Sequence, residues 1–546
     1  MNENADAPAG QANAYPLLIK QLWLSPLAIS ANQQIVYKGT HRQTYRQTRQ
    51  RIARLANVLQ TIGVRAGDTV AVMDWDSHRY LECYFAIPMM GATLMTVNVR
   101  LSASQIAYTL NHSKAQVLLM HADFKPVVDE LRAELEHVRH IIWLADDAGL
   151  PVPGLPVCVG EYENLLSQAQ PDHVFPDFDE NTRATTFYTT GTTGQPKGVY
   201  FSHRQLVLHT LSGMAALASP EVSQRFHRGD VYMPMTPMFH VHAWGMPYIA
   251  TLLGVKQVYP GRYMPDELLR LIDTEAVTFS HCVPTILQML LSSASATSVD
   301  LSRWKVVIGG AALSGGLVDA ARDRGIDVFG GYGMSETCPL LSIAQLHPAL
   351  GTLDRETEVV WRCKAGAAVP LVELRCVDSQ LQDVAEDGAA SGEVVVRAPW
   401  LTQGYLDRPE ASAELWSGGY LHTQDIGYFE QGYLKITDRL KDVIKTGGEW
   451  VSSLEIEDLL SQHVAVADCA VIGVADEKWG ERPLALVVTR PGHQSSEVAL
   501  KGHLAAYSAN GQISRFAVPA RIVFVDVIAK TSVGKNDKKT LRERFG

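Results

Sequence analysis

Short apolar runs alternate with helical stretches along much of the chain, and this alternation limits the possible folds more than any other feature. Residues 51–62 carry apolar side chains at helical spacing and stop at Gly63. Strands that alternate with helices are joined by crossovers, which favours largely parallel sheets. The sequence therefore predicts an α/β fold, with buried strands expected at 69–73, 116–120, 140–144 and 305–308.

The pattern changes after Gly392. A strand at 393–397 and a glycine-rich run of short strands predict a small β-barrel-like part. Residues 437–449 are charged and end in a glycine pair, which is typical of a boundary. The rest predicts a small α+β domain, with a capping box at 452–455, strands at 470–474, 484–488 and 522–527, and a helix at 498–507.

The length of 546 residues exceeds what one core usually holds. We therefore expect a flexible tail over 1–16, a large N-terminal domain over 17–440, and a small C-terminal domain over 441–546.

Composition narrows the classes of function. The net charge of −10 argues against a general nucleic-acid binder. The seven cysteines are odd in number and never spaced Cys-x-x-Cys, which fits reduced thiols and a cytoplasmic protein. No apolar run is long enough to cross a bilayer, although peripheral membrane contact stays open.

A loop rich in threonine and glycine between residues 188 and 199 suggests a polyphosphate site. Glycines let backbone N–H groups approach an anion, while hydroxyls and an ammonium add donors and positive charge. It is not a Walker A loop, because Pro196 precedes Lys197 and Gly198 follows it. The candidate phosphate-binding residues are Thr189, Thr190, Gly191, Thr192, Thr193 and Lys197.

Three further segments carry candidate residues, each with a plainer local explanation. In the glycine-rich stretch 330–337, Glu336 is a candidate Mg²⁺ ligand. In 420–425 and 437–439, Asp425 and Arg439 could bind ribose, although the local sequence alone favours a hairpin with solvated charges. In 238–244, two histidines are spaced like weak metal ligands, but their apolar neighbours favour a pocket wall.

These segments, with Lys535 on a glycine turn near the end, occur in the order that resembles the acyl-activating, AMP-forming enzymes. That family includes acyl-CoA synthetases, adenylation domains of peptide synthetases and firefly luciferases, and the resemblance spans roughly residues 45–545. Segments 238–244 and 445–452 look most like bacterial medium- and long-chain fatty acyl-CoA synthetases and ligases of 3-methylthiopropionate.

The resemblance implies a two-step reaction. A carboxylate attacks the α-phosphate of ATP to give acyl-AMP and pyrophosphate, and the thiol of coenzyme A then displaces AMP. It implies that Lys535 is the catalytic lysine of the first step and that Lys441 is the hinge of the mobile domain. Gln424 departs from the family pattern, because glycine usually precedes the ribose-binding aspartate.

The resemblance also assigns the other residues. The nucleotide-binding set is Thr189, Thr190, Gly191, Thr192, Thr193, Lys197, Gly310, Gly331, Tyr332, Gly333, Met334, Asp425 and Arg439, with Tyr332 stacking on adenine. The substrate set is Trp244, His240, Val283, Gly309, Gly310 and Ala311, with His240 and Glu336 also catalytic. Glu336 and Thr192 are the Mg²⁺ residues, and Gly447 and Gly448 face coenzyme A.

The expected substrate is an apolar monocarboxylic acid, most of all a medium- or long-chain fatty acid, since Trp244 matches the indole gate of related synthetases. The alternatives are 3-methylthiopropionate or another short or aromatic acid, a carrier protein as acceptor, and an ATP-binding regulatory protein without turnover. A homodimer is left open.

Overall fold

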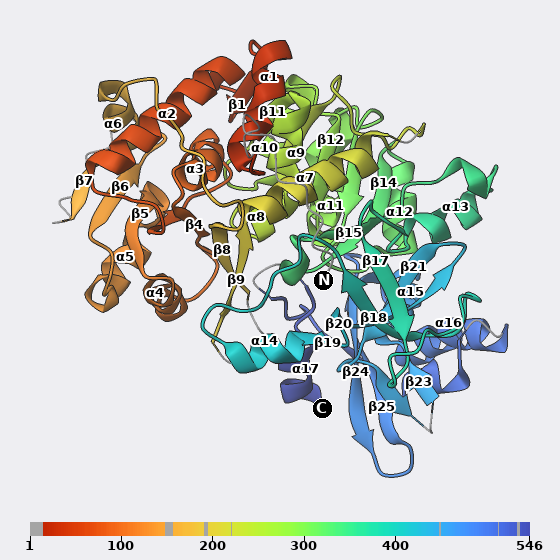
Figure 1. The fold of residues 1–546 in the computed structure, drawn as a ribbon. Coiled ribbons are helices and arrows are strands. Elements are labelled where there is room, and N and C mark those ends of the chain that lie inside the picture. Colours follow the sequence, from red (N-terminus) through yellow and green to blue (C-terminus); the bar gives the residue numbers. More distant parts are fainter. Residues whose placement is uncertain are drawn as a thin grey trace, which may run out of the picture.

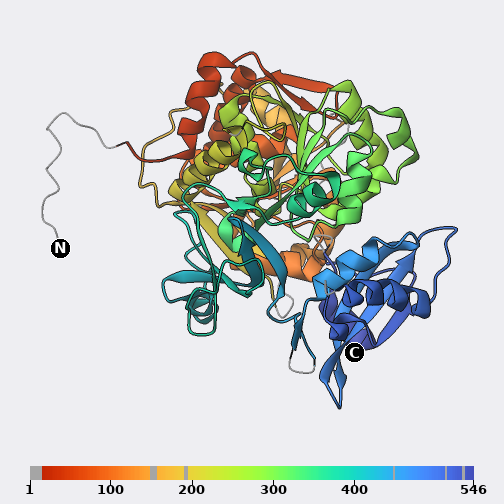
Figure 2. The ribbon, with the colours of Figure 1, turned by 90° about the vertical axis from the view of Figure 1, so that its right-hand side faces the viewer.

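The computed structural model describes residues 15–147, 157–189, 195–219, 221–446, 449–510, 513–531 and 535–546. A large N-terminal part carries three sheets, and a smaller C-terminal part carries a fourth (Figure 1). Turned by a quarter, the C-terminal part forms a separate lobe beside the larger body (Figure 2). The predicted α/β class with a large N-terminal and a small α+β C-terminal region is confirmed.

The first sheet supplies most of the site described below. Its central neighbours β10, β12, β13 and β14 run parallel, so their carboxyl ends meet at one edge. In spatial order the strands are β16 (Ala367–Ala368), β15 (Leu340–Ile343), β14 (Asp327–Gly333), β13 (Lys305–Ile308), β12 (Phe279–Cys282), β10 (Val231–Met235), β11 (Lys256–Tyr259), β1 (Gln34–Tyr37) and β2 (His41–Thr44).

The second sheet is parallel except at one edge, where β8 and β9 form an antiparallel pair. Helix α3 (His78–Met89) is buried along its whole length and packs against strands of both sheets. The strands in order are β7 (Cys158–Glu161), β6 (His140–Leu144), β5 (Ala115–His121), β3 (Thr69–Met73), β4 (Thr93–Thr96), β8 (Arg183–Thr189) and β9 (Lys197–Ser202).

The chain passes from the third sheet to the fourth between Arg439 and Ile444, and Lys441 lies in this passage. The third sheet is antiparallel and contains β17 (Glu373–Val377), β18 (Gly392–Arg397), β20 (Tyr420–Glu430), β19 (Trp416–Ser417) and β21 (Tyr433–Arg439). The fourth contains β22 (Ile444–Thr446), β23 (Glu449–Val451), β24 (Val466–Asp476), β25 (Gly480–Thr489) and β26 (Arg521–Phe524).

Helices cover the sheets and fill the space between them (Figure 1). In the N-terminal part they are α1 (Leu24–Ile29), α2 (Tyr45–Thr61), α3, α4 (Ala103–His112), α5 (Lys125–Leu131), α6 (Tyr162–Gln168), α7 (His203–Ala218), α8 (Val241–Trp244), α9 (Met246–Leu253), α10 (Pro265–Thr274), α11 (Pro284–Leu291), α12 (Gly315–Arg322), α13 (Arg355–Arg362) and α14 (Pro409–Leu415). The C-terminal part has α15 (Ser453–Ser461), α16 (Glu497–Ala509) and α17 (Lys538–Phe545).

Local capping explains where the structure differs from the expected boundaries. Helix α2 begins at Tyr45, earlier than the predicted residue 51, because Thr44 and Gln47 form a reciprocal capping box. Ser452 caps α15 by accepting the Glu455 backbone N–H, the half of the predicted box that the structure contains. The last predicted strand is shorter than expected, since β26 ends at Phe524.

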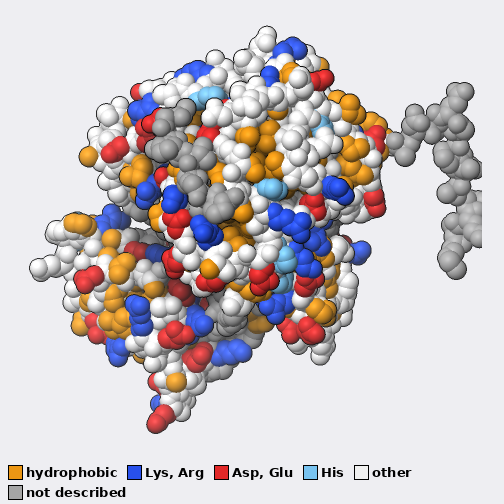
Figure 3. Space-filling model, turned by 90° about the vertical axis from the view of Figure 1, so that its left-hand side faces the viewer, with side chains coloured by type: hydrophobic (Ala, Val, Ile, Leu, Met, Phe, Trp, Pro, Cys, Tyr) orange, Lys and Arg blue, Asp and Glu red, His pale blue; other side chains and the backbone are white. Residues whose placement is uncertain are grey.

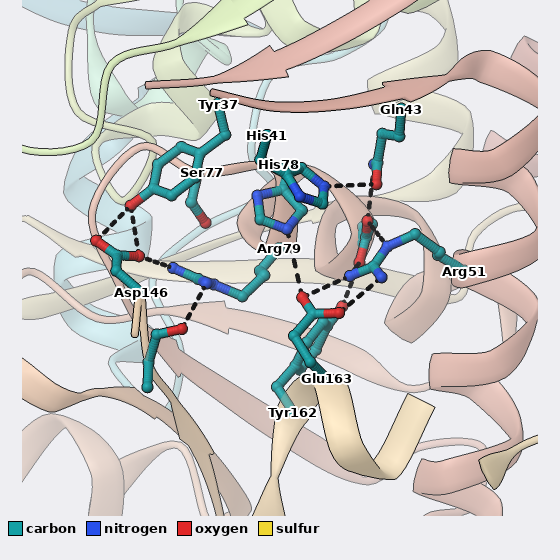
Figure 4. Close-up of polar contacts among 12 residues, drawn as sticks. Tyr37, His41, Gln43, Arg51, Ser77, His78, Arg79, Asp146, Tyr162 and Glu163 are labelled. Carbon is teal, nitrogen blue, oxygen red and sulfur yellow. Dashed lines mark hydrogen bonds and ion pairs between the residues drawn. The ribbon is translucent and has the colours of Figure 1, made fainter. Parts of the chain in front are cut away.

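A network of ion pairs around the buried residues Arg79 and Glu82 joins α2, α3, α6 and the chain after β6 (Figure 4). Arg51 binds Glu82 and Glu163, each at 2.7 Å. Arg79 binds Asp146 at 2.6 Å, and Tyr37 donates to the same carboxylate at 2.8 Å. We call Arg51, Arg79, Glu82, Asp146 and Glu163 the paired network.

Charged side chains of both signs are interspersed on the face seen in Figure 3. Within the described residues, no helix is long and apolar enough to cross a membrane.

Candidate active site

The site begins where the central parallel strands of the first sheet end. Gly309 and Gly310 follow β13, Val283 follows β12, and Trp244 comes from the chain after β10. A methyl group on Gly309 would lie 3.0 Å from the Trp244 ring, and one on Gly310 would lie 3.2 Å from Val283. Parallel α/β sheets bind ligands at this edge, and the predicted substrate residues Trp244, Val283, Gly309 and Gly310 come together there. The structure gives no such contact for Ala311, which follows Gly310 and is exposed.

Lys535 reaches this edge from the C-terminal domain. Its Cε atom lies 3.8 Å from the position of a methyl group on Gly310. Burial, followed by the positive charge of Arg439, lowers the pKa of Lys535 to about 8. Among the described residues none forms a hydrogen bond or ion pair with the Lys535 ammonium. The Lys535 side chain thus lies at the strand edge beside Gly310.

Asp425 is held by two side chains from different segments. The Tyr332 hydroxyl donates to its Oδ2 at 2.8 Å, and Arg439 Nε lies 3.3 Å from its Oδ1. The Asp425 backbone N–H donates a hydrogen bond to the Thr423 hydroxyl oxygen at 3.1 Å. The predicted nucleoside residues Tyr332, Asp425 and Arg439 therefore form one cluster.

Gln424 adopts a left-handed conformation with φ of 59°. This region favours glycine, and an L-residue there costs about 1–2 kcal/mol. The departure from the family pattern at Gln424 therefore coincides with local backbone strain.

The glycines of the 330–333 stretch are required by tight backbone packing. A methyl group on Gly333 would lie 1.8 Å from the Pro339 carbonyl oxygen, and one on Gly331 would lie 2.9 Å from Val307. Any side chain at these positions would force strand β14 apart from its neighbours. The sequence analysis placed Gly331 and Gly333 in the nucleotide-binding set and did not predict this structural requirement. Met334 continues this stretch and is half-buried.

Glu336 is buried and bonded to a residue that the sequence analysis did not identify. The Tyr405 hydroxyl donates to Glu336 Oε1 at 2.7 Å, and the Lys197 ammonium lies 4.7 Å from the centre of the Tyr405 ring. Thr189 lies beside Lys197 in the β8–β9 pair. The signal for Tyr405 in the sequence is weak: it follows Gly404 within a turn-rich run.

Six of the predicted residues lie outside the described residues, namely Thr190, Gly191, Thr192, Thr193, Gly447 and Gly448. Their assignments remain predictions. Lys441 lies in the passage between the third and fourth sheets, and its role as a hinge likewise remains a prediction.

Trp244 ends a left-handed turn. Val241, His242, Ala243 and Trp244 all have φ between 47° and 59°, and Gly245 follows at 71°. Only the glycine suits this region, so the other residues store strain of about 1–2 kcal/mol each. Close packing compensates, because a methyl group on Gly245 would lie 2.6 Å from the His209 ring. The sequence offered no signal for this turn.

The two histidines of this segment have different surroundings. His242 is fully buried among aromatic rings, with its ring centre 5.2 Å from that of Phe187, and makes no hydrogen bond among the described residues. Burial, followed by the charges of Lys535 and Arg100, lowers the pKa of His240 to about 3. His240 is therefore neutral at physiological pH and can act as a hydrogen-bonding group rather than as a cation.

Asp76 fixes the chain that leads to His240. It accepts hydrogen bonds from the Met238 backbone N–H at 2.8 Å and from the Tyr263 hydroxyl at 2.5 Å. Asp76 follows β3 of the second sheet, whereas Met238 follows β10 of the first. This contact ties the two sheets together next to the site, and no sequence pattern indicated it.

The donor set suits a magnesium ion bound together with a nucleotide. The described residues contain no group of three or more His, Cys, Asp or Glu side chains that could hold a metal alone. Mg²⁺ is commonly bound by one or two carboxylates plus substrate phosphates and water. Glu336, whose Oε1 is taken by Tyr405, retains Oε2 for such a role.

Comparison with known proteins agrees with this geometry. Residues 28–406 match the model of the AMP-binding enzymes, and residues 455–535 match the model of the AMP-binding enzyme C-terminal domain. The chain belongs to the AMP-binding enzyme family. The C-terminal match of this AMP-binding enzyme ends at Lys535, the residue that reaches into the site.

Curated relatives cover almost the whole chain. A long-chain-fatty-acid–CoA ligase of Thermus thermophilus is 40% identical over 92% of this chain and 90% of its own length. A 3-methylmercaptopropionyl-CoA ligase of Ruegeria lacuscaerulensis is 36% identical over 98% of both chains. A medium-chain-fatty-acid–CoA ligase of Ectopseudomonas oleovorans is 33% identical over 92% of this chain and 91% of its own.

Solved structures share the fold. The anthranilate CoA ligase AuaEII, in complex with anthranoyl-AMP, matches 97% of this chain and 98% of its own with a TM-score of 0.84 at 23% identity. The Mycobacterium tuberculosis fatty acyl CoA synthetase matches 97% of this chain and 98% of its own with a TM-score of 0.69 at 27% identity.

Proposed function

We propose that this protein is an ATP-dependent, AMP-forming acyl-CoA synthetase. The observation that carries the proposal is the position of Lys535, which brings a half-buried cation from the C-terminal domain to the strand edge lined by Gly310 and Trp244. The relatives named as CoA ligases support the same reaction.

In the first step the substrate carboxylate attacks the α-phosphorus of ATP, and the bond to pyrophosphate breaks. The Lys535 ammonium stabilises the negative charge that develops at the α-phosphate and the carboxylate. Asp425 accepts the ribose hydroxyls, and Lys197 holds the departing pyrophosphate. Positioning of the two substrates supplies much of the rate enhancement.

In the second step the thiol of coenzyme A attacks the acyl carbon, and AMP leaves. For this step the C-terminal domain is expected to rotate about Lys441, which withdraws Lys535 and presents Gly447 and Gly448. The family's Mg²⁺ would be held by Glu336, together with Thr192, and would neutralise phosphate charge.

The proposed acid is apolar. Trp244 and Val283 flank Gly309 and Gly310, so the acyl group meets an indole and an aliphatic side chain. A medium- or long-chain fatty acid fits this lining, and 3-methylthiopropionate is the second candidate because two relatives carry that activity in their names.

Acid-dependent release of pyrophosphate tests the proposal. The protein is incubated with ATP and Mg²⁺ and a series of acids: short, medium and long fatty acids, 3-methylthiopropionate and benzoate, with and without coenzyme A. We expect pyrophosphate and AMP, and an acyl-CoA product only when coenzyme A is present. Absence of acid-dependent pyrophosphate with every acid would contradict the proposal, and the acid with the highest kcat/KM names the substrate.

A further inference from the structure

We propose that Tyr405 is a positioning residue that holds the phosphate-binding lysine Lys197 and the carboxylate Glu336 in register for one magnesium–nucleotide complex. This inference rests on the proposed function and extends it, because nothing in the sequence patterns assigned a role to Tyr405.

The backbone of Tyr405 is fixed to the strand that starts at Lys197. Tyr405 pairs with Val199 across an antiparallel bridge, and the Leu406 backbone N–H donates to the Gly198 carbonyl at 2.8 Å. A methyl group on Gly198 would lie 3.1 Å from Leu406 Cβ, so the two segments approach closely because residue 198 is glycine. The Tyr405 backbone N–H donates a hydrogen bond to the Ser412 hydroxyl oxygen at 2.8 Å.

The side chain of Tyr405 bridges two elements that are far apart in sequence. Its hydroxyl donates to Glu336 Oε1 at 2.7 Å, and its ring lies 4.7 Å from the Lys197 ammonium. The Glu336 backbone is also anchored nearby, since its carbonyl accepts the Thr402 N–H at 3.0 Å. Residues 402–406 thus contact both sides of the site.

This arrangement suits a ligand that carries a cation and a polyphosphate together. A hydrogen bond to a carboxylate fixes its orientation and leaves the second oxygen free. A cation over an aromatic face is restrained without losing its charge. Tyr405 therefore holds the proposed metal-binding carboxylate and the proposed phosphate-binding ammonium in place before the ligand arrives, which lowers the ordering cost of binding.

Two substitutions separate the two contacts. Tyr405→Phe removes the hydroxyl but keeps the ring, whereas Tyr405→Leu removes both. Binding of ATP is measured by calorimetry without any acid, so that no turnover occurs, once with Mg²⁺ and once with a chelator. We expect Tyr405→Phe to reduce the gain in affinity that Mg²⁺ provides by about tenfold, with little change in metal-free ATP binding. Tyr405→Leu should also weaken metal-free binding several-fold, on the order of 3–10-fold.

A matched control comes from the same strand. Tyr200→Phe removes a hydroxyl three residues after Lys197, where the ring packs on Arg183 instead of facing the site, and should leave both affinities unchanged. A double-mutant cycle of Tyr405→Leu with Lys197→Ala should be non-additive, because each change removes the same contact.

Unchanged Mg²⁺ dependence in Tyr405→Phe, or additive effects in the cycle, would overturn the inference. The two half-reactions give a second readout: release of pyrophosphate should fall about tenfold in Tyr405→Phe, while conversion of supplied acyl-AMP to acyl-CoA should not. A purely structural role would lower both equally. If the wild-type protein binds ATP with Mg²⁺ but releases no pyrophosphate with any acid, the proposed function fails and the binding result still decides the role of Tyr405.

Discussion

Two polar regions of this protein use the same residue types in different ways. In the paired network, each arginine binds at least one carboxylate, and Glu82 is fully buried between Arg51, Gln43 and Tyr162. In the site, Asp425 pairs with Arg439, but the Lys535 ammonium and Glu336 Oε2 have no hydrogen-bond or ion-pair partner among the described residues. Pairing within the chain satisfies charges for folding, whereas a charge without such a partner can be paired by a ligand.

The backbone conformations of the two regions also differ, because the paired network lies mainly on helices and the site contains left-handed residues. Helices α2 and α3, which carry the network, are regular and capped by Thr44 and Ser77. The site contains the left-handed turn at 241–245 and the strained Gln424. Strain of this kind persists only where surrounding packing compensates for it, and it concentrates at functional positions. The comparison predicts that changes in the network affect stability and changes in the site affect chemistry.

The largest effect is expected for Lys535→Ala. Loss of a preorganised cation at the developing charge should reduce acid-dependent pyrophosphate release by about a thousandfold. Conversion of supplied acyl-AMP to acyl-CoA should stay near the wild-type rate, because the proposed rotation about Lys441 would withdraw Lys535 in that step. Both half-reactions are followed by single-turnover chromatography.

The control for this variant is Lys539→Ala. Lys539 lies on α17, where its exposed side chain pairs with Glu543 at 3.8 Å, so both half-reactions should be preserved. Equal loss of both half-reactions in Lys535→Ala would contradict the assignment of this lysine to adenylation alone.

The network is tested by Arg51→Met. Removing the arginine leaves Glu82 buried without its charge partner, which should lower the free energy of unfolding by about 3 kcal/mol. Denaturant unfolding measures this loss, with Arg46→Met on the exposed side of α2 as the control. Both half-reactions should be unchanged in the folded protein. A loss of adenylation without a loss of stability would mean that the network serves the site directly.

The sequence predicted the residues that lie within one recognisable segment better than it predicted the contacts between distant segments. Lys197 and Thr189 lie within one loop, and Glu336, Asp425, Arg439 and Lys535 each stand in a recognisable segment, so their types and order indicated a nucleotide site. Sheet topology places the ends of β13 and β14 side by side, but Asp425 and Arg439 come from the third sheet and Lys535 from the C-terminal part, so their contacts depend on how these parts pack. Periodicity carries no such information, and family resemblance supplied it.

Other features could not be predicted because tertiary packing overrides local preference. Val241, His242 and Ala243 disfavour the left-handed region, yet they adopt it. Tyr405 and Asp76 act through contacts with residues that are 69 and 162 positions away. The strand positions were predicted well, since burial sets their apolar runs, whereas the start of α2 depended on a capping pair that lies outside the apolar stripe.

A smaller effect is expected from pH. The pKa of Lys535 is lowered to about 8 by burial and by Arg439, while Asp425 and Glu336 oppose the shift and Lys441 adds to it. The ammonium is charged below this pKa and loses its charge above it, so kcat/KM for ATP should be constant at lower pH and fall about tenfold per pH unit above it. Pyrophosphate release across a pH series measures this profile.

Lys535→Arg provides the comparison for the pH profile. Its guanidinium stays charged over the whole range, so its lower activity should show no decline of this kind. A wild-type profile that stays flat to about pH 10, near the usual lysine value, would mean that burial does not lower the pKa of Lys535 in solution.

The smallest effect concerns the strained residue beside Asp425. Gln424→Gly should raise the free energy of unfolding by about 0.5–1 kcal/mol, because relief of the left-handed conformation exceeds the greater chain entropy of glycine. The Gln424 side chain is exposed, and its backbone N–H can still donate to Glu393. Asp425 keeps its hydrogen bonds with Tyr332 and Thr423, so affinity for ATP should not change.

Gln431→Gly, with φ of 49° in the turn after β20, is the matched control outside the site. If both variants gain the same stability and ATP binding is unchanged, the strain at Gln424 is a property of the local turn alone. If Gln431→Gly gains stability but Gln424→Gly binds ATP more weakly, the strain at Gln424 orients Asp425.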